Sequence, residues 1–268
     1  MAATRRLVPA LRYGPADNPV IALRVGILVV AALTWEGLAR SGLFYRDVIP
    51  TLGPIAAAVM RLMTDPAFYW HLLATARETA AALLIGSLAG LAAGLALGIN
   101  RFLGRAFEPH LYYLGPTPKI IFFPIIIMWF GVGGGSKIAM GAISCFFPVA
   151  LSAAAGVRGI DPILIRVGRS FRAGTFQMIT KIYLPAMREP AINGLRLGLG
   201  VAIIGVLLAE TKLSNRGLGF LIIQFYQRFD MPAMYALIAI VFALAILINA
   251  AVGRLLARKP TARAQHEA

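Results

Sequence analysis

The sequence contains one cysteine, Cys145, and three histidines, His71, His110 and His266, among 268 residues. Cys145 lies inside an apolar stretch, so neither a disulfide framework nor a thiolate metal site is expected. No His-Glu-x-x-His segment, serine nucleophile elbow or pair of membrane aspartates occurs in the sequence. These absences argue against metal-dependent and nucleophilic catalysis, so an intramembrane hydrolase or transferase is the weakest of the functions considered.

A nucleotide-binding loop is also missing. Residues 131–137 read Gly-Val-Gly-Gly-Gly-Ser-Lys, but this segment lacks the Gly-Lys-Ser/Thr ending of a phosphate-binding loop. It also follows an apolar span rather than a strand, so we interpret it as a turn between two membrane spans. No cofactor or metal is therefore expected on this chain, which should not hydrolyse ATP alone.

Acidic residues are scarce: 11 Asp and Glu stand against 26 Lys and Arg, giving a net charge of +15. Only 14% of the residues are charged, 59% are hydrophobic, and the mean hydropathy is +0.77. A soluble domain cannot bury so much apolar surface, whereas a bundle of membrane helices requires it. The excess of basic residues then indicates membrane topology and contact with anionic lipid rather than nucleic-acid binding.

Six segments are apolar enough to cross the hydrocarbon core, which takes about 20 helical residues. They are residues 20–38, 72–99, 109–130, 137–157, 191–210 and 232–256. The third is the least regular, because Pro116, Pro118 and Pro124 should bend or break it. The alternation of a barrel strand is absent, so the sequence predicts an all-α, polytopic membrane protein with about six transmembrane helices.

The distribution of Lys and Arg predicts the orientation. Basic residues are concentrated in the segments that share a side with both termini, which places the N- and C-termini in the cytoplasm. Residues 1–19 and 257–268 are therefore predicted to be cytoplasmic tails around a transmembrane domain at 20–256. Arg5 and Arg6 are not followed by a small-x-small cleavage site, so we expect a retained first helix. Residues 52–63 are predicted to form an amphipathic helix on the outer surface.

The most informative loop is the polar segment 161–174 between the fourth and fifth spans. Asp161 and Pro162 form a good helix start, because Asp can cap free amides and Pro has its φ already set. Gly174 ends the run, and Thr175 is expected to cap a second helix that stops at Leu184-Pro185. Apolar and basic residues recur at helical spacing along the first helix: Leu164, Val167 and Phe171, and Arg166, Arg169 and Arg172. A folded hairpin of this kind predicts a docking element.

Glycines recur every fourth residue in the second span. They are Gly86, Gly90, Gly94 and Gly98. Small residues on one helical face let a second helix approach closely, so we predict a packing seam, with a moving gate surface as the alternative.

Ionisable residues within the spans are candidates for function, because they are costly at membrane depth. Lys119 is the deepest; it could contact an anionic substrate, pair with a carboxylate or bind backbone carbonyl groups. Glu36, Glu78 and Glu210 lie near outer span ends, where we expect their side chains to extend toward water. Glu210 has the strongest case among them as a pathway residue. Arg196 is expected to reach water or to pair near the inner end of its span.

Short blocks of sequence follow one another in a characteristic order between residues 114 and 252. They are Gly115-Pro116-Thr117-Pro118-Lys119-Ile120, Pro124, Trp129-Phe130-Gly131-Val132-Gly133, Ser136-Lys137-Ile138, Phe146-Phe147-Pro148, Gly156-Val157-Arg158, Asp161-Pro162, Ile182-Tyr183-Leu184-Pro185-Ala186, Gly194-Leu195-Arg196, Ala209-Glu210 and Gly217-Leu218-Gly219. With these blocks the chain resembles the permease subunit of a bacterial ATP-binding-cassette (ABC) importer of the nitrate, sulfonate and taurine type.

The resemblance implies a type I importer permease fold and a coupling loop at 158–189. It assigns ATPase coupling to Leu164, Arg166, Val167, Gly168, Arg169, Ser170, Phe171, Arg172, Ala173, Gly174, Phe176, Leu184 and Pro185. Two departures stand out. Arg166-Val167-Gly168 replaces the usual Glu-Ala-Ala, and Arg172 occupies the usual turn glycine, which suggests that the hinge has moved to Gly174. A partner ATPase with a more acidic groove is our hypothesis.

The resemblance also implies a division of labour. A second permease copy, expected to form a homodimer, would complete the pathway in the bacterial inner membrane. A cytoplasmic ATPase dimer would bind ATP and Mg, and an extracytoplasmic binding protein would deliver a small, often anionic solute. The alternative function is an ATP-independent carrier or channel. For the loop at 161–174 itself, the alternative to docking is a basic segment that rests on anionic lipid.

Overall fold

The structure is a computed structural model that describes residues 18–44 and 48–256. Helices account for nearly all regular structure in these ranges, and no strand occurs in them, which confirms the all-α prediction. The described chain divides into two compact units, the first ending at Ala57 and the second beginning at Ala58. The predicted basic tails, including Arg5 and Arg6, lie outside the described residues except for Asn18 and Pro19, which begin the first helix.

The first unit contains α1 (Asn18–Arg40) and the beginning of α2 (Leu52–Thr64). α2 coincides with the predicted amphipathic helix to within one residue. The Glu36 carboxylate accepts a hydrogen bond from the Leu52 amide at 2.9 Å and forms an ion pair with Arg40 at 2.6 Å. Glu36 therefore does not simply extend toward water, because it stabilises the start of α2.

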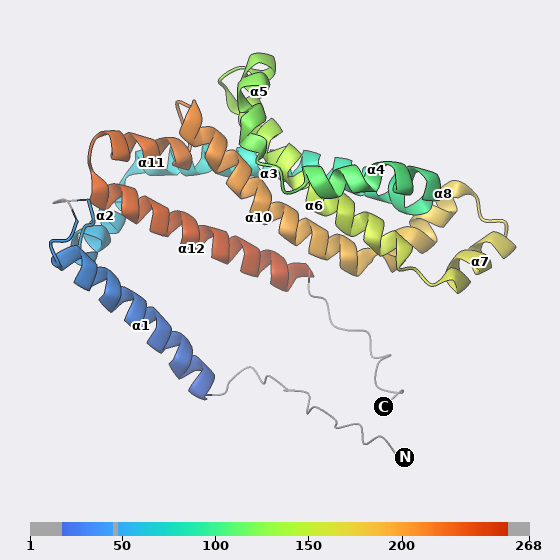
Figure 1. Ribbon diagram of the computed structural model, residues 1–268, viewed down its shortest axis with the longest axis horizontal. Helices are drawn as coiled ribbons and strands as arrows, with labels where there is room; N and C mark the ends of the chain where they lie inside the picture. Colours follow the sequence, from blue (N-terminus) through green and yellow to red (C-terminus); the bar gives the residue numbers. More distant parts are fainter. Residues whose placement is uncertain (1–17, 45–47, 257–268) are drawn as a thin grey trace. The chain divides into compact units, whose positions relative to one another are not determined.

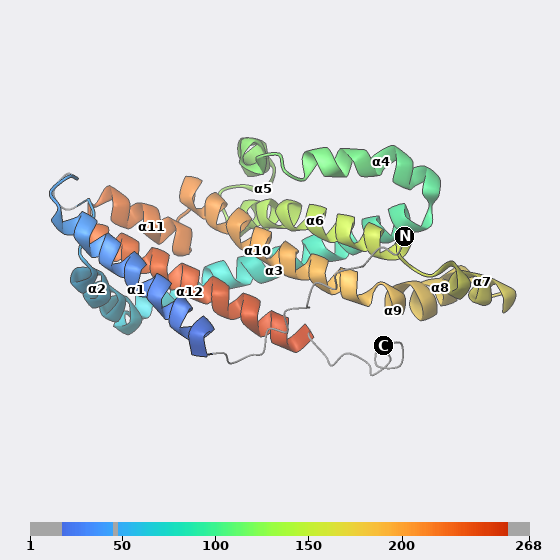
Figure 2. The same cartoon turned by 60° about the horizontal axis from the view of Figure 1, so that its bottom comes forward.

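Three long helices form the centre of the second unit: α3 (Pro66–Ile99), α6 (Gly134–Arg158) and α10 (Arg188–Lys212). α6 packs along both of the others (Figures 1 and 2). The glycines predicted as a seam lie on the face of α3 that contacts α6. A Cβ at Gly94 would lie 2.5 Å from the Ala150 carbonyl oxygen and from the Ala153 Cβ. The two backbones therefore approach as closely as only glycine allows.

A second set of small residues faces α6 from the opposite side. On α10, a Cβ at Gly198 would lie 2.8 Å from the Cys145 sulfur, and one at Gly205 would lie 2.9 Å from the Ser144 hydroxyl oxygen. Cys145 and Val149 of α6 are fully buried between the two seams. α6 is thus enclosed by glycine-bearing faces of α3 and α10, and only the α3 face was predicted.

The third predicted span is broken. α4 (Arg101–Leu114) is followed by a 3-10 turn, η1 (Lys119–Phe122), and by α5 (Phe123–Phe130), with a 93° bend between the two parts. The break lies at two of the three predicted prolines, Pro116 and Pro118, whereas Pro124 lies in the first turn of α5. The predicted start at Pro109 is wrong, because α4 begins at Arg101, where Asn100 caps it by accepting from the Phe102 amide at 2.9 Å. Pro109 lies inside this helix.

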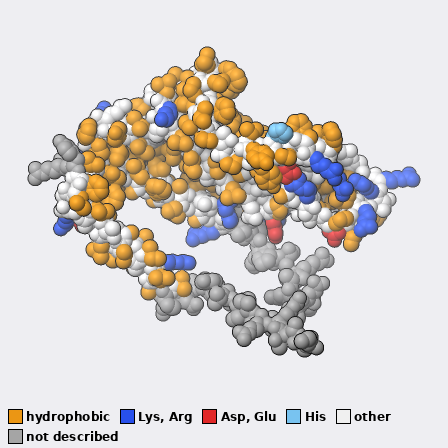
Figure 3. All heavy atoms as spheres, in the orientation of Figure 1, with side chains coloured by type: hydrophobic (Ala, Val, Ile, Leu, Met, Phe, Trp, Pro, Cys, Tyr) orange, Lys and Arg blue, Asp and Glu red, His pale blue; other side chains and the backbone are white. Residues whose placement is uncertain are grey.

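The remaining helices complete the second unit. α12 (Met231–Leu256) matches the last predicted span, and α11 (Leu218–Gln227) is a short apolar helix before it that was not predicted. Within the described ranges, five helices are long and apolar enough to cross a membrane, or six if the bent pair is one span. α11 lies at one end of this unit and α7 at the other (Figure 1). Lys and Arg side chains gather at the α7 end (Figure 3).

Candidate functional site

The loop between α6 and α10 folds as a helical hairpin. It contains α7 (Pro162–Ser170), α8 (Thr175–Met178), a π-helical turn, η2 (Ile179–Tyr183), and α9 (Leu184–Ala186). The Asp161 carboxylate accepts a hydrogen bond from the Ile163 amide at 2.8 Å, which confirms the predicted start.

The second arm of the hairpin differs from the prediction at both ends. Its N-cap is Gly174 rather than Thr175, and the Gln177 side chain accepts from the Gly174 amide at 3.1 Å. The helix does not stop at Leu184-Pro185. It continues through Ala186, because Pro185 falls in the first turn of α9 after the π-helical turn, where a missing N–H is tolerated.

The turn of the hairpin is a Schellman motif. The Ala173 amide donates to the Gly168 carbonyl at 3.0 Å, and the Arg172 amide donates to the Arg169 carbonyl at 2.9 Å. Arg172 occupies the left-handed position of this motif with φ 51°, whereas Gly174 is extended with φ −67°. The suggestion that the hinge has moved to Gly174 is therefore wrong. Arg172 adopts the conformation that glycine would adopt more easily.

The hairpin has a buried face and an exposed face. On the buried face, Met178 and Tyr183 pack against Val157 of α6, and Gly168 approaches Met178 so closely that a Cβ would not fit without movement. On the exposed face, Phe171 is 83% exposed. The other apolar members of this face are also exposed: Leu164, Val167, Phe176 and Leu184. The hairpin is fixed to the bundle by one face and offers apolar side chains on the other.

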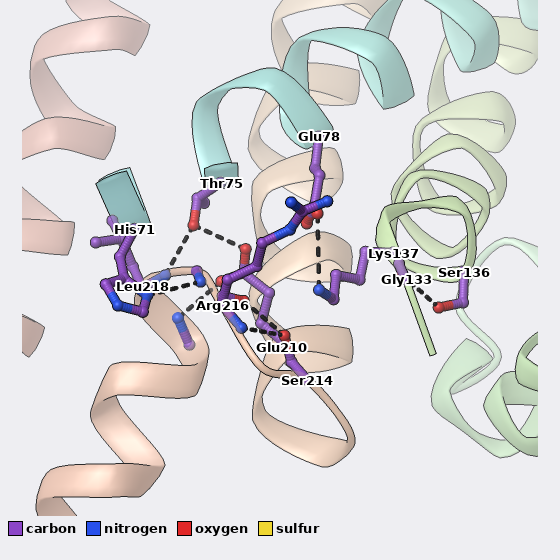
Figure 4. A network of polar contacts seen from close by, with 12 residues as sticks. His71, Thr75, Glu78, Gly133, Ser136, Lys137, Glu210, Ser214, Arg216 and Leu218 are labelled. Atoms are coloured by element: carbon purple, nitrogen blue, oxygen red, sulfur yellow. Dashed lines mark hydrogen bonds and ion pairs between the residues drawn. The ribbon is translucent and has the colours of Figure 1, made fainter. Parts of the chain in front are cut away.

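A network of buried polar groups occupies the opposite end of the second unit (Figure 4). Its centre is Glu210 of α10, which is 1% exposed. The Thr75 hydroxyl of α3 donates to Glu210 at 2.7 Å, and the Gly219 amide donates to it at 2.7 Å. Thr75 in turn accepts from the Leu218 amide at 2.8 Å, and His71 Nδ1 accepts from the Gly217 amide at 3.1 Å. Side chains of α3 and α10 therefore cap the start of α11.

An ion pair lies beside this network. Lys137 Nζ of α6 is 3.6 Å from Glu78 Oε1 of α3, and the two side chains are 0% and 5% exposed. Among the described residues, neither the Glu78 carboxylate nor the Lys137 amine has a hydrogen-bond partner. The Arg216 guanidinium lies next to Glu78 (Figure 4). Four charged side chains, two of each sign, thus gather at this end of the bundle.

These positions correct two expectations. Glu78 and Glu210 do not extend toward water, because both are buried within the bundle. The predicted turn at 131–137 is wrong beyond Gly133, because α6 begins at Gly134 and Lys137 is a fully buried helical residue. The spacing of His71, Thr75 and Glu78 on α3 places polar groups on one helical face within an apolar span. That pattern is the signal in the sequence from which the network could have been found.

Lys119 and Arg196 contact backbone carbonyls. Lys119 Nζ donates to the Gly115 carbonyl and, at 3.3 Å, to the Thr117 carbonyl, and it lies 4.8 Å from the centre of the Phe147 ring. Of its three predicted alternatives, the carbonyl contact is the one observed. The Arg196 side chain donates to the Gly253 carbonyl of α12 at 3.3 Å. Within residues 18–44 and 48–256, neither cation forms an ion pair.

Comparison with known proteins gives consistent similarities. The family model described as binding-protein-dependent transport system inner membrane component matches residues 82–260. The chain is 31% identical over 236 residues to SsuC of Bacillus subtilis, a protein named for aliphatic sulfonate transport, covering 87% of this chain and 85% of that one. It is 29% identical over 237 residues to the taurine transport permease TauC of Escherichia coli, covering 85% of each chain.

A solved structure has the same fold. The inward-facing MetNI methionine ABC transporter matches with a TM-score of 0.59 at 20% identity, covering 72% of this chain and 98% of that chain. At this identity the match shows the fold, which is that of a type I importer permease.

Proposed function

The chain belongs to the family of binding-protein-dependent transport-system inner-membrane components, and on this premise we propose that it carries a small anionic solute in response to a cytoplasmic ATPase. As an ABC importer permease it is a multi-pass protein of the inner membrane. ATP and Mg are proposed to bind on the ATPase, because the sequence contains no phosphate-binding loop.

The observation that carries the proposal is the exposed face of the α7–α9 hairpin. Phe171 and Phe176 are 83% and 78% exposed, although the opposite face of the hairpin is packed on α6. A rigid, half-buried element with exposed aromatic side chains is suited to transmit motion from a partner subunit. We propose that this face binds the groove of an ABC ATPase, and that the arginines beside it favour a groove rich in Asp and Glu.

The solute class rests on the relatives. SsuC and TauC are named for aliphatic sulfonates and taurine, and both are covered over most of their length. We therefore propose a small sulfonated or similarly charged solute, delivered by an extracytoplasmic binding protein. Two copies of the chain would form the pathway as a homodimer. The hairpin end would then face the cytoplasm, with both termini on that side.

Lys119 and Glu210 stay candidates for the pathway. The contacts of Lys119 with the Gly115 and Thr117 carbonyls support a structural role at the bend between α4 and η1. Uptake of labelled solute by cells producing Lys119→Ala separates the two roles. A raised half-saturation concentration would support a pathway role, and unchanged uptake would remove Lys119 from the pathway.

The docking proposal is tested by co-purification with a cognate ABC ATPase. Burying a Phe side chain contributes about 2 kcal/mol, so Phe171→Ala should weaken ATPase retention by roughly 30-fold. Phe242→Ala is the matched control, because Phe242 is also exposed but lies on α12. Arg172→Glu should weaken retention as well if the groove is acidic. Equal retention by wild type, Phe171→Ala and Arg172→Glu would contradict the docking proposal.

The same preparation tests the alternative of an ATP-independent carrier. Liposomes that contain the permease and the ATPase, with the binding protein supplied outside, should accumulate the solute only when ATP is enclosed. Accumulation should stop when the ATPase loses its catalytic carboxylate. Transport by the isolated chain without an ATPase would favour the carrier.

A further inference from the structure

A cavity of about 1160 Å³ lies at the α7 end of the second unit. Its walls come from the end of α3, one side of α4 from Arg101 to Tyr113, the end of α6, one side of α7 and Tyr183 of η2. It is separate from the exposed aromatic face of the hairpin, because neither Phe171 nor Phe176 lines it.

The cavity has a surplus of positive charge. Five arginines line it: Arg101, Arg105, Arg158, Arg166 and Arg169. Glu108 is the one carboxylate among the lining residues, and it accepts hydrogen bonds from both terminal nitrogens of Arg158. Elsewhere in the described chain the ion pairs involve other residues, so the remaining four arginines form none. Because like charges repel one another, a bound anion would stabilise this arrangement.

The uncharged part of the lining is apolar. Leu97, Val157 and Ile165 form part of the wall. The aromatic side chains of Phe102 and Tyr113 are largely exposed on α4, the helix that also carries Arg101 and Arg105. Aromatic and basic residues near the ends of membrane helices are typical of the boundary between lipid and water. A dissolved inorganic anion would gain nothing from the apolar wall, whereas an amphiphile would.

We propose that this cavity binds the headgroup of an anionic phospholipid. The phosphate diester lies among Arg101, Arg105 and the two α7 arginines, and the first carbons of the acyl chains lie against the apolar wall. A planar guanidinium presents paired donors that match two phosphate oxygens. Basic pockets between membrane helices on the cytoplasmic side are known to suit anionic headgroups. The inference rests on the proposed orientation, with the hairpin end in the cytoplasm. Because the two α7 arginines are also proposed for ATPase coupling, the test uses Arg101 and Arg105, which lie on α4 outside the hairpin.

The test uses the full chain reconstituted in phosphatidylcholine vesicles that contain a minority of phosphatidylglycerol. After extraction in detergent, the lipids retained per protein are quantified by mass spectrometry. Arg101→Gln/Arg105→Gln removes two cavity charges without altering the hairpin, and it should reduce retained phosphatidylglycerol by about 30-fold, the factor for two arginine–headgroup contacts. Lys181→Gln/Arg188→Gln is the matched control, because both residues are exposed near the same end but do not line the cavity.

Further measurements distinguish a bound phospholipid from free phosphate and from a contact with the ATPase. Arg101→Lys/Arg105→Lys keeps the charge and the fold, and it should retain an intermediate amount of phosphatidylglycerol because the paired donors are lost. Equal retention by wild type and the double Gln variant would overturn the proposal, and so would an equal loss in the control. Displacement of the lipid by dissolved sodium phosphate would show that the cavity takes free phosphate instead. Loss of ATPase binding with unchanged lipid would assign these arginines to the partner subunit.

Discussion

Replacing only one residue of the Glu78–Lys137 ion pair should lower the free energy of unfolding much more than replacing both residues. At 3.6 Å and an effective dielectric constant of about 20, the attraction between the two charges is about 5 kcal/mol. Removing one partner leaves the other charge buried without compensation. We expect Lys137→Met to lower the free energy of unfolding by about 3 kcal/mol, the low end of the range for buried pairs, because Arg216 lies next to Glu78 and compensates part of its charge.

The double variant Glu78→Gln/Lys137→Met tests whether the two buried charges interact. It removes both buried charges at once, so we expect it to be more stable than Lys137→Met by about 2 kcal/mol or more. The free energies come from reversible unfolding in mixed micelles with increasing SDS, followed by circular dichroism. Additive effects of the two single substitutions would show that the charges do not interact, and this would refute the reasoning.

An exposed ion pair supplies the control. Arg40 is 73% exposed where it pairs with Glu36, so Arg40→Gln should change the free energy of unfolding by about 0.5 kcal/mol or less. A change in Arg40→Gln as large as that in Lys137→Met would mean that the assay reports net charge rather than buried pairing.

Three further pairs of substitutions test the helix packing, the turn of the hairpin and the cap of α11. Gly94→Leu should destabilise the bundle by about 3 kcal/mol or more, because its Cβ would meet the backbone of α6. Gly200→Leu should be tolerated, because its Cβ would point into open space. Equal unfolding midpoints for the two variants would contradict the seam. Arg172→Gly should stabilise the protein by about 1 kcal/mol, because glycine adopts the left-handed backbone conformation of Arg172 without strain. Gly174→Ala should not stabilise it. A lower thermal unfolding midpoint for Arg172→Gly would argue against this turn. Thr75→Val should lower the free energy of unfolding by about 1–3 kcal/mol, and Thr75→Ser should lower it much less, because the hydroxyl is the group that bridges Glu210 and the start of α11. Identical unfolding of the two variants would exclude that bridge.

The features set by local chemistry could be predicted from the sequence. The long helices of the second unit follow from uninterrupted apolar composition, and the break before η1 follows from Pro116 and Pro118. The start of α7 follows from Asp161 and Pro162, whose side-chain capping and fixed φ act within a few residues. In each case the deciding interaction lies within one or two helical turns.

The features set by tertiary packing could not be predicted in the same way. Thr75 and Glu210 are 135 positions apart, and no local pattern pairs them. The burial of Lys137 could not be predicted either, because its partner, Glu78, belongs to another helix. The left-handed conformation of Arg172 also escaped prediction, because the Schellman bonds of α7 impose it against the preference of the residue itself.

The glycine seams give α6 a mechanical role. α6 begins beside the Glu78–Lys137 pair and ends at Arg158, just before the hairpin, about 37 Å away for 25 helical residues. Gly94 on α3 and Gly198 on α10 leave no room for α6 to slide by a residue along either neighbour. A displacement of the hairpin should therefore tilt α3, α6 and α10 together. We therefore expect a movement that starts at the hairpin to reach the Glu78–Lys137 pair at the other end of α6.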